Sequence, residues 1–122
     1  MPKGSFSSAF VFAWQGLGYV VRTQRNMRIH LSVAAAVLLV AGALRVSALE
    51  LAVLLLCIMA VVALEMLNTV VEAVVDLTTE EYDPLAKIAK DVAAGAVLVT
   101  SAGAAIVGVL ILGPHLASAL GR

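Results

Sequence analysis

The sequence predicts an all-α integral membrane protein, built from one amphipathic surface helix and three transmembrane helices. Hydrophobic residues make up 62% of the 122 residues and charged residues only 13%, whereas an ordinary soluble domain has roughly 25% charged residues. A domain this small leaves much of its surface exposed, so lipid has to cover the excess apolar side chains. Three apolar segments each approach the roughly 20 residues that a spanning helix requires. We expect residues 1–122 to form a single membrane domain.

The surface helix is predicted at about residues 5–22, where apolar residues recur at helical spacing after Ser5, a suitable N-cap. Trp14 and Tyr19 suit the boundary between lipid and water, because their rings can keep one polar end wet. A helix of this kind lies in the plane of the lipid headgroups. Lys3 is not followed by an apolar run with a small-residue cleavage site, so a removable signal peptide is not expected.

The three spans are predicted at about residues 28–46, 49–76 and 86–112. The linker TTEEYDPL between the second and third spans has turn chemistry, and the small residues that follow Asp91 would let the third span approach a neighbouring helix closely. Basic residues are divided unevenly between the two sides of the predicted membrane domain. Six lie on the side that holds the N-terminus and this linker, namely Lys3, Arg22, Arg25, Arg28, Lys87 and Lys90. Two lie on the opposite side, Arg45 and Arg122. The positive-inside rule therefore predicts a cytoplasmic N-terminus.

Polar residues in the second half of the second span form one face. Glu65, Asn68, Glu72 and Asp76 fall within an arc of about 80° and climb roughly 16 Å along the helix. An ionised side chain at the centre of a bilayer costs roughly 2.5 to 3.5 kcal/mol, so this face is expected to meet protein or water. A simpler interpretation, that the helix end emerges into the cytosol, explains Asp76 but not the deeper Glu65 and Asn68.

The start of the third span adds Lys90 and Asp91 near this acidic face. For Lys90 alone, extension of its ammonium group to the membrane surface is a competing interpretation. Carboxylates, an amide and a lysine together suit Mg²⁺, which binds one or two carboxylates plus substrate phosphates, and so indicate a nucleotide and phosphoryl transfer. The chain has neither a Walker A sequence nor a GxGxxG loop, which excludes a soluble kinase or P-loop scaffold.

These motifs resemble the bacterial integral membrane diacylglycerol kinase family, which includes the undecaprenol kinases, over essentially the whole chain. The resemblance lies in Glu65-x-x-Asn68-Thr69-x-x-Glu72-x-x-Val75-Asp76, in Ala89-Lys90-Asp91, in Glu81-Tyr82 and in Trp14-x-Gly16. The segments QRNMRIH and PLAKIAKD are closer to the undecaprenol kinase branch.

The resemblance implies a homotrimer in the bacterial cytoplasmic membrane, with active sites shared between subunits, that uses MgATP to phosphorylate a lipid alcohol such as undecaprenol or diacylglycerol in lipid recycling and envelope biogenesis. It implies that Glu65 is the general base and that Asn68 positions reacting groups. Glu72 would be a metal ligand, and Asp76, Lys90 and Asp91 would bind the nucleotide. The family usually has a second metal-binding Glu where this chain has Gln24, so the second metal and full activity depend on an amide oxygen.

Two other functional interpretations stay open. A small oligomeric channel or proton-conducting subunit would also carry an intramembrane acid such as Glu65, and the Gln24 difference is compatible with a catalytically weakened kinase relative.

His30 is expected to be an interface residue hydrogen-bonded near Arg28, His115 a solvated terminal residue, and Cys57 a packing residue. The eight Lys and Arg balance the eight Asp and Glu, which gives no reason to expect a nucleic-acid partner.

Overall fold

The computed structural model describes residues 4–121, and these form four helices without a strand: α1 (Phe6–Thr23), α2 (Arg25–Leu44), α3 (Ala48–Thr78) and α4 (Pro84–Leu120). The last three are long and apolar enough to cross a membrane. The predicted surface helix and spans therefore match four real helices, with ends that differ by up to eight residues. Two of the basic residues on which the predicted orientation depends, Lys3 and Arg122, lie outside the described residues.

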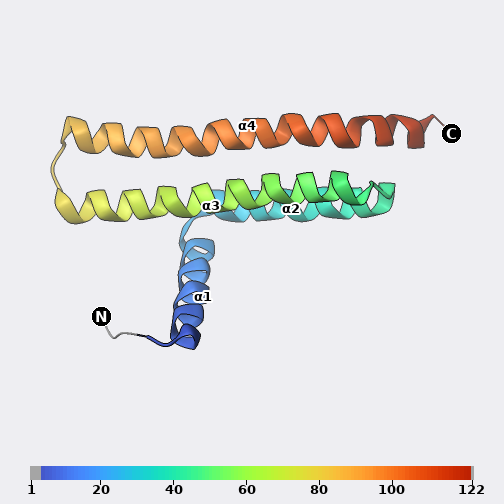
Figure 1. The fold of residues 1–122 in the computed structure, drawn as a ribbon. Helices are drawn as coiled ribbons and strands as arrows, with labels where there is room; N and C mark the ends of the chain where they lie inside the picture. Colours follow the sequence, from blue (N-terminus) through green and yellow to red (C-terminus); the bar gives the residue numbers. More distant parts are fainter. Residues whose placement is uncertain (1–3, 122) are drawn as a thin grey trace.

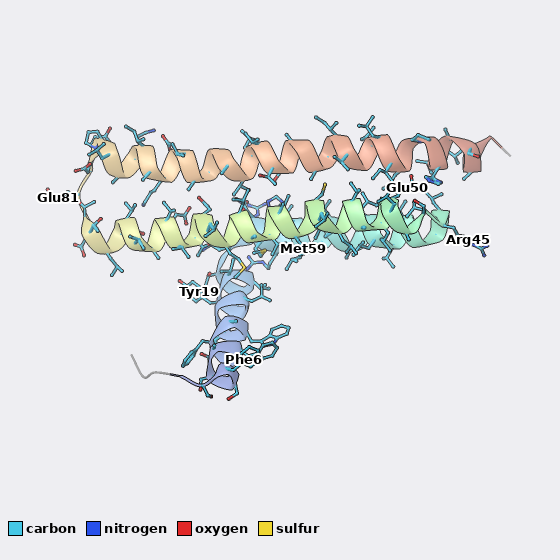
Figure 2. All side chains as sticks on the ribbon, in the orientation of Figure 1. Phe6, Tyr19, Arg45, Glu50, Met59 and Glu81 are labelled. Atoms are coloured by element: carbon cyan, nitrogen blue, oxygen red, sulfur yellow. The ribbon has the colours of Figure 1, made fainter. Side chains whose placement is uncertain are left out.

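The helices α2, α3 and α4 run alongside one another, and α1 leaves this bundle transversely (Figure 1). The α1 helix buries only Val20, while Phe6, Phe12, Trp14 and Tyr19 are each more than half exposed. Figure 2 shows Tyr19 beside the bundle and Phe6 at the far end of α1. An aromatic, lipid-compatible surface on a helix lying across the bundle is the arrangement of a helix in the membrane interface.

The corner between α1 and α2 is fixed by Arg28. Its guanidinium Nη1 donates hydrogen bonds to the backbone oxygens of Val21, at 3.0 Å, and Arg22, at 2.9 Å. These carbonyls end α1 and have no partner within the helix. Because Met27 is fully buried beside this corner, the level at which α1 crosses the bundle is set by the first residues of α2.

The helices α3 and α4 are antiparallel and keep one register along their length. Lys90 Nζ donates to Asp76 Oδ1 at 2.7 Å near one end, and His115 Nε2 lies 3.1 Å from both carboxylate oxygens of Glu50 near the other. His115 is thus paired across the two helices, and its prediction as a solvated terminal residue is wrong. The chain does not turn away at Pro114, because α4 continues through it to Leu120.

Unequal helix lengths place the polar part of α3 beyond the first span. The 20 residues of α2 measure about 30 Å, the thickness of a bilayer core, whereas α3 has 31 residues and α4 has 37. Because α2 and α3 are joined by a short turn at Arg45, the extra length of α3 lies at the α1 side of the bundle (Figure 1). The carboxyl end of α3 and the start of α4 therefore extend past the level of α1.

Candidate active site

The acidic face of α3 passes from a buried end to an exposed end. Glu65 is 1% exposed and Asn68 is 8% exposed, Glu72 is half-buried, and Asp76 is exposed. The order follows the helix outward from the level of α2 to the part that extends past α1. One helix face therefore offers a sheltered carboxylate at its inner end and a carboxylate open to water at its outer end.

Asn68 and Glu72 form the middle of this face. The Asn68 amide donates to Glu72 Oε1 at 3.3 Å, while its own Oδ1 is buried without a hydrogen-bond partner. A buried acceptor without a partner is uncommon in proteins, and here it lies next to a carboxylate. Two hard oxygen atoms from neighbouring turns of one helix suit Mg²⁺.

Few side chains among the described residues lie close enough together to bind a metal ion. Among residues 4–121 there is no group of three or more His, Cys, Asp or Glu side chains that could hold a metal ion. Mg²⁺ commonly takes one or two protein carboxylates and completes its shell with water and substrate phosphates. The pair formed by Asn68 and Glu72 therefore fits a magnesium ion that arrives with a nucleotide, and does not fit an all-protein metal cage.

The outer end of the face combines Asp76 with Lys90 of α4 through their 2.7 Å ion pair. Lysine carries three N–H donors, so this contact leaves Lys90 able to donate to a further anion. Asp91 does not join this cluster, because it pairs with Lys87 one turn earlier on the exposed side of α4. The predicted closeness of Lys90 to the acidic face is confirmed, and Asp91 is seen in contact with its own helix.

Gln24 occupies the junction between α1 and α2, as the C-cap of one helix and the N-cap of the other. Its amide nitrogen donates to Thr23 Oγ1 at 3.4 Å, and no contact joins it to Glu72. The contact between His30 of α2 and Glu65 of α3 shows which residues of the two helices lie at the same level. Gln24 precedes His30 by six residues, and Glu72 follows Glu65 by seven. Because these helices are antiparallel, Gln24 and Glu72 lie at nearly the same level of the bundle.

His30 occupies a different position from the predicted one. It was expected near Arg28 as an interface residue, but its ring faces α3, with Nε2 3.6 Å from Glu65 Oε2. Residues two apart on a helix point in different directions, so Arg28 reaches back to α1 while His30 faces the bundle. The sequence contains no local signal for this contact, because the partner lies on another helix.

Two hollows adjoin this level of the bundle. A cavity of about 550 Å³ runs between α2, α3 and α4 and is lined mainly by aliphatic side chains, among them Val37, Ile58 and Val109, and also by Cys57. A smaller hollow between α2 and α4 contains Asn26 and Leu98, and His30 and Ser101 line both. Cys57 is a free, half-buried thiol on the wall of the larger cavity, and its packing role stays a prediction. An apolar cavity of this size within membrane-length helices suits a hydrocarbon chain.

The small residues at the start of α4 leave open space on one side of this helix, while α4 packs along α3. A Cβ atom added at Gly95 would meet no atom within 4 Å, and Ala94 is exposed. In the part of the chain that the structure describes, this side of α4 therefore has room for a neighbour.

Comparison with known proteins identifies the family to which this chain belongs. Residues 11–112 match the family model described as prokaryotic diacylglycerol kinase. A diacylglycerol kinase of Synechocystis sp. is 50% identical over 111 residues, which are 90% of this chain and 63% of that relative. An undecaprenol kinase of Bacillus subtilis is 42% identical over 111 residues, 91% of this chain and 90% of its own length. The chain thus spans less than two thirds of the first relative and nearly all of the second. It belongs to the prokaryotic diacylglycerol kinase family, as a multi-pass membrane protein.

Proposed function

We propose that this protein transfers the γ-phosphoryl group of ATP to the hydroxyl group of a membrane lipid alcohol, undecaprenol or diacylglycerol. The observation that carries the proposal is the single α3 face on which a buried carboxylate, an amide with a free oxygen, a half-buried carboxylate and an ion-paired carboxylate follow one another outward. Family membership and relatives named as lipid kinases support it.

In this proposal each residue acts at its own level of the bundle. Asp76, Lys90 and Asp91 bind the nucleotide at the water-exposed end, with the free donors of Lys90 on its phosphates. Asn68 positions the transferred group, and its free amide oxygen lies in the same pair with Glu72, which would hold Mg²⁺. Gln24, at nearly the same level of the bundle, would be a further ligand of that ion. That ion would offset the negative charge on the phosphate oxygens.

The proton moves at the inner end of the face. The acceptor chain lies in the apolar cavity between α2, α3 and α4, which brings its hydroxyl group to the level of Glu65. Glu65 accepts the hydroxyl proton as the oxygen attacks the γ-phosphorus, the bond from that phosphorus to the bridging oxygen breaks, and ADP leaves. Burial of Glu65 keeps water, the competing acceptor, away from the carboxylate.

Three larger-scale statements belong to the same proposal. Residues 1–122 form one kinase domain in the bacterial cytoplasmic membrane, with the α1 side of the bundle facing the cytoplasm, where ATP is present. The positive-inside count supports this orientation. The protein assembles as a homotrimer with active sites shared between subunits, supported by the family resemblance and by the open side of α4 at Gly95.

A channel or proton-conducting subunit is not favoured, because it needs one mid-membrane acid and gives no role to the pair formed by Asp76 and Lys90. The test is transfer of radiolabelled phosphate from ATP in mixed micelles, with undecaprenol, diacylglycerol and ceramide compared side by side. We expect labelled product from undecaprenol or diacylglycerol. Absence of labelled lipid with all three acceptors, together with proton flux through the protein in liposomes, would overturn the proposal.

A further inference from the structure

Three polar side chains lie at one level within the bundle, one each from α2, α3 and α4. His30 faces Glu65 at 3.6 Å. The ion pair between Lys90 and Asp76 fixes how the antiparallel helices α3 and α4 are aligned. Ser101 lies eleven residues after Lys90 on α4, and Glu65 lies eleven residues before Asp76 on α3. Ser101 and Glu65 therefore lie at the same level of the bundle. Apart from these residues, the surroundings of this level are mainly aliphatic.

The Glu65 carboxylate has few partners there. Its Oε2 is buried and accepts no hydrogen bond. The neighbouring polar side chains are used elsewhere, because Thr69 Oγ1 donates to the Glu65 backbone oxygen at 3.0 Å and the Asn68 amide donates to Glu72. A buried ionised carboxylate without a partner is costly, and His30 is the side chain whose polar atom approaches it.

We propose that His30 is a positioning residue for the proton-accepting step: its Nε2–H holds the Glu65 carboxylate in the orientation that receives the acceptor's hydroxyl proton. The inference rests on the proposed kinase function. At 3.6 Å the contact is longer than a hydrogen bond, and contacts of this kind often tighten only when substrate is bound. The role requires a hydrogen on Nε2, which donates to the carboxylate.

The location of the ring supports this role. His30 lines both hollows, with 24% of its side chain exposed and its Nε2 3.6 Å from Glu65. The ring therefore adjoins both the carboxylate and the space that the acceptor chain enters. The nucleotide-binding pair of Asp76 and Lys90 lies eleven residues farther along α3, about 16 Å away, so loss of the His30 contact leaves ATP binding unchanged.

The test compares His30→Leu with His30→Gln in the full-length protein, purified in mixed micelles with the acceptor lipid that the parent uses. Leucine removes the donor but fills space, whereas glutamine can place an N–H close to the position of Nε2. We expect kcat of His30→Leu to fall about 100-fold, as for small misplacements of reacting groups. We expect kcat of His30→Gln to stay within about tenfold of the parental kcat, since the glutamine keeps an N–H donor near the carboxylate. The KM for ATP should be unchanged in both variants.

The chain offers a matched control in its second histidine. His115 also faces a glutamate across two helices, at 3.1 Å from Glu50, but at the Arg45 side of the bundle. His115→Leu is expected to retain the parental kcat. A double variant distinguishes positioning from packing, because His30→Leu should cause no further loss of kcat in a Glu65→Gln background if His30 acts through Glu65.

Each outcome decides the matter. A folded His30→Leu with parental kcat would overturn the inference, and so would a folded His30→Gln that is as slow as His30→Leu. If His30→Leu does not fold, kcat of His30→Gln alone tests the inference. A loss of about 100-fold in that kcat, with a parental melting temperature, would contradict the positioning role of His30. A parent that phosphorylates no lipid would instead refute the proposed function itself.

Discussion

At the scale of single residues, the graded exposure along α3 matches two opposite demands of phosphoryl transfer to a lipid. A general base works best where water cannot compete for its proton, and Glu65 is 1% exposed. A nucleotide arrives from water, and the Asp76 side chain is 66% exposed where it meets Lys90. Eleven residues of one helix separate these environments, so one helix face can serve both reactants.

The acidic face was predictable from sequence, whereas the partners of its inner end were not. Spacing of three, four and four residues places the members of this face on one side of any α-helix. The contacts of His30 with Glu65 and of His115 with Glu50 join different helices. They depend on register and on the level of the α1 corner, neither of which hydropathy encodes.

Gln24 gives a prediction about the metal. In Gln24→Glu a carboxylate replaces the amide at the level of Glu72, so less free Mg²⁺ should be needed, and we expect the concentration that gives half-maximal transfer to fall by roughly tenfold, about 1.4 kcal/mol of binding. A magnesium titration at saturating ATP measures this. The matched control is Gln15→Glu, which adds the same charge on the exposed surface of α1. Equal titration curves for Gln24→Glu and the parent would remove Gln24 from the metal shell.

At the scale of helices, apolar windows predicted the existence and order of all four elements but misjudged their ends. The first span begins at Arg25 and not at residue 28, because the helix continues through polar residues that lie outside the apolar window used to predict the span. The third ends at Leu120 and not at 112, since α4 continues through Gly113 and Pro114. Pro114 thus lies inside α4, where membrane-spanning helices tolerate proline.

The start of α3 is fixed by a reciprocal capping arrangement. Ser47 Oγ accepts from the Glu50 backbone N–H at 3.1 Å, and Glu50 Oε1 accepts from the Ser47 backbone N–H at 2.9 Å. Glu50 also meets His115 of α4, so one carboxylate joins the helix cap to the neighbouring helix. The Glu50 carboxylate thereby sets the register at the Arg45 side of the bundle.

Ser47→Ala tests this arrangement. Loss of the cap should lower the free energy of unfolding by about 1 kcal/mol, measured by denaturant titration in micelles. Ser5→Ala is a matched control, because Ser5 is the N-cap of α1 but its side chain makes no bond to the helix backbone. Equal losses of stability in the two variants would show that the capping box contributes nothing of its own.

At the scale of the whole molecule, the structure separates a lipid-facing part from a part that extends past it. The α2 helix matches the bilayer, α1 lies across the bundle at its edge, and the ends of α3 and α4 reach beyond that level (Figure 1). Glu81, in the turn between those ends, is labelled far from Arg45 and Glu50 in Figure 2. The ion pair of Asp76 and Lys90, proposed to bind the nucleotide, lies in the extended part, and the apolar cavity lies in the membrane part.

The proposed sharing of active sites between subunits gives a prediction of its own. If Glu65 of one subunit works with Lys90 of another, co-expression of Glu65→Gln with Lys90→Ala should restore part of the transfer activity that each variant lacks alone. Phosphate transfer by the co-purified mixed oligomer, with its subunit number from native mass spectrometry, measures this. Mixed trimers that stay inactive would show that each site is built within one chain.

The most direct test of the central claim, that the buried inner end of the α3 face carries the proton-accepting base, is phosphate transfer by Glu65→Gln beside the parent. The amide keeps the shape of Glu65 but cannot accept the proton, so transfer to the lipid should fall at least about 100-fold while ATP binding in the same preparation stays at the parental level. Transfer at the parental rate by folded Glu65→Gln would contradict the account.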